Sequence, residues 1–468
     1  MLATGQAEHG QVREETARAL QLRLAAAQSR SRVPSVVAGI ARAGRLIWFG
    51  AATGMDVVAP PDQTQYRCGS ISKTFVAVEV MRLRDEGLIE LDARIGSYLN
   101  ELDHLGCTVR QLLSHTSGLR AETAGPWWER TPGVPFETLV ATSLREVDEL
   151  HRPGRRFHYS NVGYAVLGEL VRRVRGAPWD EVVTAELLEP AGMLRTTAHP
   201  VPPHAEGYGV HPHADVLLPE PAHDAGAMAP AGQLWTTVGD LARWSSVLAG
   251  ERPEVLAQES AAEMREPVAL NDLPGQPWTV AYGLGLELFN REGRRSYGHR
   301  GSMPGFLAAL RVDELTGDGV VVMANATSGL EPSLESDLLS MLESLEPAPP
   351  EPWQPLPGGV AGNVLDLTGA WYWGTSGFIL SATRDGHLDL HALGLGREAT
   401  FRPAGEDLFV GLSGYYAGET LRVARDAGGR PSRLDLGSFV FTRLPYDPAA
   451  GTPGGVDARG WQGRAPSH

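Results

Sequence analysis

A proline-rich stretch divides this chain of 468 residues into two unlike parts. Residues 346–361 are dense in proline, which fixes the backbone dihedral φ and cannot continue a helix or a central strand. Such a stretch is predicted to be a stiff linker. With 42% apolar residues, the chain can bury a large core. We therefore expect two folded domains with a linker between them.

The part before the linker alternates helical periodicity with apolar runs. Those runs predict four buried strands, at residues 36–40, 46–50, 306–312 and 319–324. The pattern is typical of a mixed α/β domain, which we place at 33–345. Residues 1–32 are predicted to form an N-terminal helical segment ahead of it.

The part after the linker contains short alternating segments separated by turn signals. Examples of the segments are 378–380, 387–390 and 439–442, and Asp385-Gly386 is one of the turns. About eight such strands would form a small antiparallel β-barrel, which we place at 362–447. Residues 448–468 are rich in glycine, proline and alanine and are predicted to be a disordered tail.

Charge and segment composition argue against several classes of partner. The formal net charge is -15 and the arginines are scattered, so we expect neither nucleic acid nor a membrane surface as a partner. Residues 1–30 lack the apolar core of a signal peptide, and no run approaches about 18 apolar residues. The two cysteines fit a reduced compartment. We expect a cytoplasmic protein.

A single lysine stands out against forty arginines. Lys73 follows Ser70 by three positions, at the start of a predicted helix. An arginine cannot release its proton, whereas the pKa of a lysine responds to its surroundings. Residues three apart share a helical face, so Lys73 can reach the serine hydroxyl and activate it as a nucleophile. The alternative is a surface lysine that happens to follow a serine.

Two further segments carry candidate site residues. Tyr159 and Asn161 precede a predicted helix, and a cationic neighbour would stabilise the phenolate and make Tyr159 a proton acceptor. The alternative for Tyr159 is packing at a helix start. His299 ends a strand beside glycines that allow close backbone approach, which would direct it into a cleft. A hydrogen-bonded structural histidine is the alternative there.

Together these segments resemble the serine β-lactamase and penicillin-binding-protein superfamily, closest to its class C-like esterase and D-peptidase branch. Residues 108–119 and 229–235 also look like the family, and the resemblance covers about 33–340. It implies a β-lactamase/transpeptidase-like domain with an antiparallel sheet flanked by helices. The three motifs, in family order, are S-x-x-K at Ser70–Lys73, Y-x-N at Tyr159–Asn161, and a K-T-G counterpart at His299–Gly301.

The resemblance implies a role for each motif residue. Ser70 would attack an acyl carbonyl, while Lys73 and Tyr159 share its proton. The backbone N–H groups of Ser70 and Ser302, next to Gly301, would hold the oxyanion.

Asn161 would orient Lys73 or the substrate amide. His299 replaces the usual lysine and would support Tyr159 or bind a substrate oxygen. This departure argues against β-lactam breakdown.

With export and β-lactam breakdown set aside, we expect an acyl-transfer reaction inside the cell. A catalytic domain followed by a lipocalin-like barrel resembles penicillin-binding-protein-type thioesterases, which release and cyclise nonribosomal peptides head to tail. In this leading interpretation, a peptide with a D-residue at the acyl position, presented on a carrier protein, acylates Ser70. The alternatives are a cytoplasmic esterase or D-amino-acid peptidase or amidase that only hydrolyses, and a catalytically silent peptide-binding homologue. We expect no cofactor and no metal.

Four further residues are candidates for substrate binding. Trp127 and Trp128 would wall the acyl pocket, or else pack within their loop, and Trp235 is similar. Arg443, in the last predicted strand of the barrel, would reach a substrate carboxylate or carbonyl. Alternatively it stacks on Trp371 of the lipocalin-like Gly-x-Trp and closes the barrel.

Overall fold

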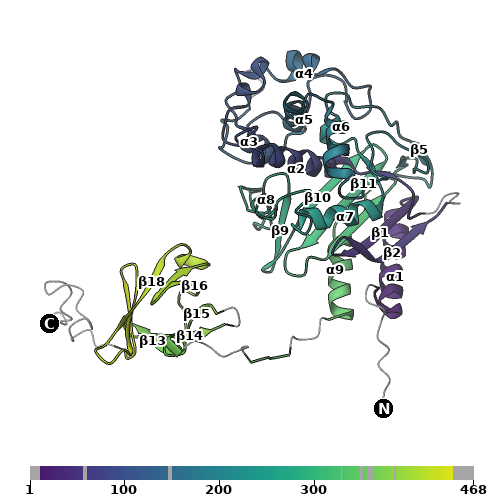
Figure 1. Cartoon of the computed structure of the whole chain (residues 1–468). Helices are drawn as coiled ribbons and strands as arrows, with labels where there is room; N and C mark the ends of the chain where they lie inside the picture. The colour runs from purple at the N-terminus through teal and green to yellow at the C-terminus, as the bar shows by residue number, and fades with distance from the viewer. Residues whose placement is uncertain are drawn as a thin grey trace. The chain divides into compact units, whose positions relative to one another are not determined.

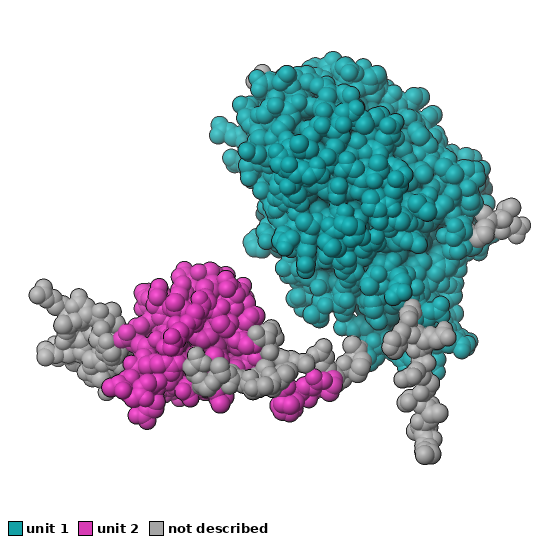
Figure 2. All heavy atoms as spheres, in the orientation of Figure 1, with its two compact units in different colours: residues 1–348 teal, residues 349–468 magenta. Residues whose placement is uncertain are grey.

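The chain folds into two compact units, residues 1–348 and 349–468, which Figure 2 colours separately. The division falls inside the proline-rich stretch 346–361. The tail expected at 448–468 lies outside the described residues. The computed structural model describes residues 11–55, 61–145, 150–327, 329–347, 352–355, 362–383 and 386–445.

An eight-stranded antiparallel sheet forms the centre of the first unit, in the order β2-β1-β12-β11-β10-β9-β8-β7. Its first and last strands in the chain, β1 and β12, pair with each other, with Val36 opposite Ala324. The four strands predicted from apolar runs are all present. The bounds are β1 Ser35–Arg42, β2 Arg45–Thr53, β7 Ala269–Leu270, β8 Val280–Tyr282, β9 Glu287–Arg291, β10 Arg294–Met303, β11 Phe306–Asp313 and β12 Gly319–Ala324.

Helices cover both faces of this sheet, so its central strands are buried on both sides. On β1, Val36 packs in the core beneath α1 and α9, whereas its neighbour Val37 packs in the larger core that contains α2, α5 and α7. Figure 1 shows α1 and α9 together on one side of the sheet. The helices are α1 Glu14–Ser31, α2 Ser72–Asp85, α3 Val109–Leu113, α4 Phe136–Ser143, α5 Asn161–Arg175, α6 Trp179–Val183, α7 Val238–Leu248, α8 Gln258–Met264 and α9 Leu334–Leu345.

The N-terminal helix, expected as a segment of its own, is packed into the first unit. Leu20, Leu24 and Ala27 of α1 are buried against the sheet and α9. Two short strand pairs complete this unit: β3 Tyr66–Arg67 with β6 Trp235–Thr236, and β4 Tyr208–Val210 with β5 Leu217–Pro219. Among the described helices, none is long and apolar enough to cross a membrane.

The second unit is a closed antiparallel barrel, which confirms the predicted architecture. Closure brings β13 beside β20, with Tyr372 opposite Thr442. Trp371 and Phe401 are among the fully buried side chains of its interior. A short helix, α10 Gly362–Leu365, precedes the strands, which are β13 Gly369–Trp373, β14 Ser376–Ala382, β15 Leu388–Ala392, β16 Ala399–Gly405, β17 Leu408–Gly411, β18 Thr420–Arg425, β19 Pro431–Leu436 and β20 Phe439–Thr442.

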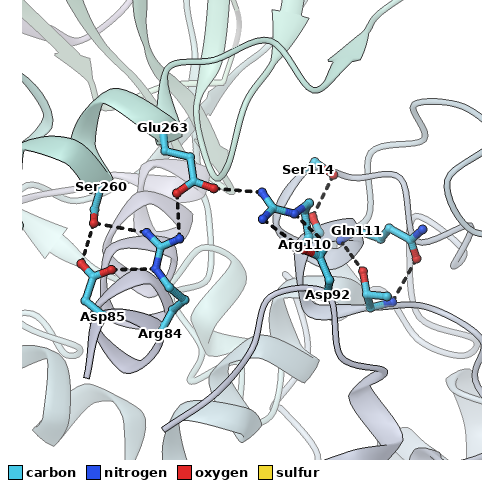
Figure 3. A network of polar contacts seen from close by, with 9 residues as sticks. Arg84, Asp85, Asp92, Arg110, Gln111, Ser114, Ser260 and Glu263 are labelled. Carbon is cyan, nitrogen blue, oxygen red and sulfur yellow. Dashed lines mark hydrogen bonds and ion pairs between the residues drawn. The ribbon is translucent and has the colours of Figure 1, made fainter. Parts of the chain in front are cut away.

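A polar network fixes the position of α2 (Figure 3). Glu263 of α8 accepts hydrogen bonds from Arg84 of α2 at 2.7 Å and from Arg110 of α3 at 3.0 Å. Arg110 also pairs with Asp92, and Arg84 with Asp85. One carboxylate therefore links three helices. Since α2 begins beside Ser70, this network helps to hold the helix that carries the candidate nucleophile.

Replacing Glu263 with Gln should lower stability in a pH-dependent way. Burial alone would raise the pKa of Glu263, but hydrogen bonds from Arg84 and Arg110 outweigh it and hold the pKa below its usual range. A depressed folded-state pKa stabilises the protein above the unfolded pKa of about 4.3, and this contribution is lost as pH falls through the folded value. We expect the variant to lose about 1 kcal/mol of unfolding free energy at pH 7.

Urea unfolding at pH 7 and at pH 3 measures this effect. The difference between variant and wild type should narrow at the lower pH. The exposed Glu266, replaced with Gln, is the matched control and should leave stability unchanged at both pH values. An equal loss for Glu263→Gln at both pH values would contradict the electrostatic explanation.

Candidate functional site

Ser70 and Lys73 meet at the start of α2. Residues Gly69–Ile71 form one 3₁₀ turn that leads directly into the helix. Ser70 is partly exposed, whereas Lys73 has no exposed surface. The Lys73 Nζ atom lies 2.9 Å from Ser70 Oγ. The structure thus brings together the pair that the three-residue spacing predicted.

Lys73 makes two further hydrogen bonds from its Nζ atom, both 2.7 Å long, to Asn161 Oδ1 and to the carbonyl oxygen of Ala231. Burial lowers the pKa of Lys73 to about 7. The negative charges of Glu122, Glu129 and Glu287 act in the opposite direction and keep the value from falling further. Near neutral pH, protonated and neutral forms are therefore both abundant, as a general base requires.

Asn161 is held by the side chain of Glu122, a residue outside the three sequence motifs. Its Nδ2 atom donates to Glu122 Oε1 at 2.7 Å, and the other oxygen of Glu122 accepts from Trp128 Nε1 at 2.7 Å. Because the Glu122 oxygen accepts from Nδ2, the Asn161 amide is oriented with Oδ1 toward Lys73. Glu122 lies in a loop, where no periodicity or motif marked it.

Tyr159 completes the group around Ser70, whose hydroxyl is near enough to act on the pKa of the phenol. The Tyr159 ring lies 5.0 Å from Lys73 Nζ. Burial raises the pKa of Tyr159 well above its usual value, although the nearby Ser70 hydroxyl acts in the opposite direction. Desolvation penalises the charged form of a phenol, so this shift favours the neutral form of Tyr159 over the phenolate. The role of Tyr159 as a proton acceptor stays a prediction.

His299 lies on β10 and is 1% exposed. Its Nε2 atom is 2.9 Å from the hydroxyl of Tyr282, and its Nδ1 atom contacts the carbonyl oxygen of Arg300. Burial lowers the pKa of His299, while Glu287 acts in the opposite direction. The rings of His299 and Tyr159 are 6.1 Å apart. The expected support of Tyr159 is thus not a direct hydrogen bond, because both ring nitrogens are directed elsewhere.

Two glycines bring the oxyanion-hole candidates together. A Cβ atom on Gly69 would lie 2.5 Å from the backbone nitrogen of Ser302. One on Gly301 would lie 1.9 Å from the carbonyl oxygen of Cys68 and 3.0 Å from the backbone nitrogen of Ser70. The two segments are therefore in backbone contact that no side chain would permit. This contact places the N–H-bearing backbones of Ser70 and Ser302 side by side, as an oxyanion hole requires.

The three tryptophans predicted to bind substrate occupy different environments. Trp128 is largely buried and bonds Glu122, close to the site. Trp127 is 59% exposed, and the guanidinium carbon of Arg130 stacks 3.8 Å from the centre of its ring. Trp235 is buried on β6 and packs edge-on against Phe306. Their contacts with substrate stay predictions.

Arg443 belongs to the barrel. Its guanidinium carbon lies 3.9 Å from the ring of Trp371, and it donates to the carbonyl oxygen of Thr368 at 2.9 Å. These contacts are those of the structural alternative, in which the arginine closes the barrel. A role in binding substrate stays a prediction.

Replacing Gly301 with Ala should disable the site, because the added methyl group would collide with Cys68 and force the two backbone segments apart. We expect labelling of Ser70 by a fluorophosphonate probe to slow by about 100-fold, in the range seen when an oxyanion-hole donor is lost. The matched control is Gly394→Ala, where nothing lies within 4 Å of the added atom. Equal labelling rates in the two variants would contradict the assigned geometry.

Comparison with known proteins places this site in a family. A family model described as Beta-lactamase matches residues 17–341, and a model described as a domain of unknown function, DUF7586, matches residues 360–443. Penicillin-binding protein 4 of Amycolatopsis lactamdurans is 27% identical over 304 residues, covering 61% of this chain and 78% of the relative. The chain spans about half to two thirds of the length of several other curated relatives.

Solved structures show the same fold. The octameric penicillin-binding protein homologue from Pyrococcus abyssi has a TM-score of 0.62 and 22% identity, covering 91% of this chain and 99% of its own. A D-stereospecific amidohydrolase from Streptomyces sp. has a TM-score of 0.57 and 26% identity, covering 70% of this chain and 98% of its own. With the Beta-lactamase model matching most of its length, the chain belongs to the β-lactamase and penicillin-binding-protein superfamily of serine hydrolases.

Proposed function

We propose that this protein is an acyl-transfer enzyme in which Ser70 attacks an ester, thioester or amide and holds the acyl group as an acyl-enzyme. The observation that carries the proposal is the 2.9 Å contact between the partly exposed Ser70 Oγ and a buried amine, Lys73 Nζ, whose pKa is about 7. A serine hydroxyl beside a base that is substantially neutral at the working pH is an activated nucleophile.

The residues around Ser70 account for each proton in the reaction. As Ser70 Oγ bonds to the substrate carbonyl carbon, its proton passes to neutral Lys73. The backbone N–H groups of Ser70 and Ser302 stabilise the oxyanion. When the bond to the leaving group breaks, Lys73 returns the proton to it through the neutral hydroxyl of Tyr159. The incoming nucleophile then bonds to the acyl carbon and gives its proton to Lys73. As the bond between the acyl carbon and Ser70 Oγ breaks, Lys73 passes this proton to Ser70 Oγ and the product leaves.

The carboxylates near Lys73 support a substrate that carries an ammonium group. Glu122, Glu129 and Glu287 all act electrostatically on Lys73. Their hydrogen bonds come from neutral donors, namely the amide of Asn161, indole nitrogens and the backbone of Arg300. The neutral His299 supplies no positive charge for an anionic β-lactam. An aminoacyl or peptidyl donor with a free amine fits this potential.

The proposed stereochemistry of the acyl residue is D. The likeness to a D-stereospecific amidohydrolase at 26% identity supports this choice. Hydrolysis is one outcome, with water as the nucleophile. Head-to-tail cyclisation of a peptide, delivered as a thioester by a carrier protein, is the second. It is favoured by the same carboxylates, which would attract the amino end of the peptide to Lys73, where it can lose its proton.

Incubation with a synthetic peptidyl thioester separates these outcomes. The donor carries a free amino end and a C-terminal D-residue, and products are identified by mass spectrometry. We expect donor consumption that is absent in Ser70→Ala and at least 10-fold slower for the L-epimer. A product lighter than the linear acid by one water would establish cyclisation, and the linear acid alone would establish hydrolysis.

Further donors and the Ser70→Ala variant test whether an acyl-enzyme forms at all. D-amino-acid amides and simple esters are tested in the same way. If wild type and Ser70→Ala process every donor equally, the acyl-enzyme proposal is wrong. A peptide-binding homologue without catalysis would then be the better interpretation, and binding of the linear peptide should survive Ser70→Ala.

The acylation rate should depend on the protonation of Lys73. Only the neutral amine can accept the proton of Ser70, so the rate should rise with pH around an apparent pKa near 7 and level off above it. Burst kinetics with a D-aminoacyl p-nitrophenyl ester between pH 5 and 9 measure this. Lys73→Arg keeps a positive charge but cannot act as the base, so its burst should slow by about 1,000-fold. A rate independent of pH would contradict this role.

A further inference from the structure

His115 lies against Tyr159. It follows α3 and has no exposed surface. Its ring centroid is 4.1 Å from that of Tyr159, with the planes inclined by 34°. The rings of Tyr164 and Tyr282 lie 5.1 Å and 4.6 Å away. One imidazole therefore packs among three tyrosines, of which Tyr159 is the nearest.

Two hydrogen bonds tie His115 to the residues on either side of Tyr159. The backbone N–H of His158 donates to the carbonyl oxygen of His115 at 2.8 Å. The backbone N–H of Ser160 donates to His115 Nδ1 at 3.0 Å. The peptide that carries Tyr159 is thus held before and after the phenol by a single residue, whose ring also covers one face of the phenol.

This arrangement is costly for His115 itself. Its backbone φ is 56°, in the left-handed region, which strains a residue other than glycine. Because Nδ1 accepts a hydrogen bond, the proton of the neutral ring is on Nε2. That atom is buried and has no hydrogen-bond partner among the described residues. A residue under these two penalties is not explained by its contribution to local stability.

We propose that His115 is the positioning residue for Tyr159, which its ring and two hydrogen bonds hold in the orientation that reaches Ser70. The inference rests on the proposed function, in which the Tyr159 hydroxyl relays the proton of the leaving group. Among the interactions of the described residues, His115 does not contact Ser70, and Tyr159 is the nearest of the three tyrosine rings around it, so we expect it to act chiefly through Tyr159. Any effect of replacing it should therefore require the Tyr159 hydroxyl.

A double-mutant cycle with Tyr159→Phe tests this dependence. The acylation rate constant with a D-aminoacyl p-nitroanilide, whose leaving nitrogen must be protonated, is measured for wild type, His115→Ala, His115→Asn and each combination with Tyr159→Phe. We expect His115→Ala to slow acylation about 10- to 100-fold, as misplaced catalytic groups do. His115→Asn keeps an acceptor for Ser160 and tolerates positive φ, so its loss should be about 3- to 10-fold. KM should change little.

In the Tyr159→Phe background, both losses should disappear, because the phenylalanine ring has no hydroxyl to position. Equal losses in the two backgrounds would overturn the inference, since they would indicate a general structural role. His151→Asn, which replaces a nearby partly exposed histidine, is the matched control and should leave the acylation rate constant unchanged. If thermal unfolding shows that His115→Ala does not fold, the double-mutant cycle is measured with His115→Asn alone.

The cycle also separates this inference from the proposed function. A wild-type protein without a burst on any donor would remove the proposed function, and this inference with it. A wild-type burst together with additive losses would remove the inference alone.

Discussion

The buried amine of Lys73 is the interaction on which the site depends. Its three acceptors belong to different parts of the chain: Ser70 before α2, Asn161 at the start of α5, and Ala231 in a 3₁₀ turn spanning Ala229–Ala231. A buried cation is tolerated only when its donors are satisfied. The same burial brings the pKa of the amine to about 7. Assembly of three segments and activation of the base thus have one physical origin.

Burial also decides the charge of the titratable groups around Lys73. Burial raises the pKa of Tyr159 and lowers the pKa values of His115 and His299, so all three are neutral at pH 7. Lys73 is then the group in this cluster that changes charge near neutrality. The phenol and the two imidazoles act through hydrogen bonds, packing and orientation. In the proposed function, the carboxylates near the site attract the ammonium group of the substrate.

The sheet and its flanking helices provide the rigidity that these contacts require. Strand β10 passes the turn that carries Ser70 so closely that glycine is needed at Gly69 and Gly301. The network around Glu263 connects α2 to α3, and the chain continues from α3 directly to His115. Ser70 and His115 therefore follow from helices that share one polar network, which lies outside the group of residues around Lys73.

Patterns carried by neighbouring residues were sufficient for part of this structure. The alternation of apolar residues predicted four strands of the sheet and the barrel, and the three-residue spacing predicted contact between Ser70 and Lys73, because both depend on backbone geometry that repeats locally. The sequence could not indicate the neutral state of Tyr159, the turn of His299 toward Tyr282, or the contacts of Glu122 and His115. Those follow from desolvation and from contacts between distant segments, which exist only once the tertiary structure has formed.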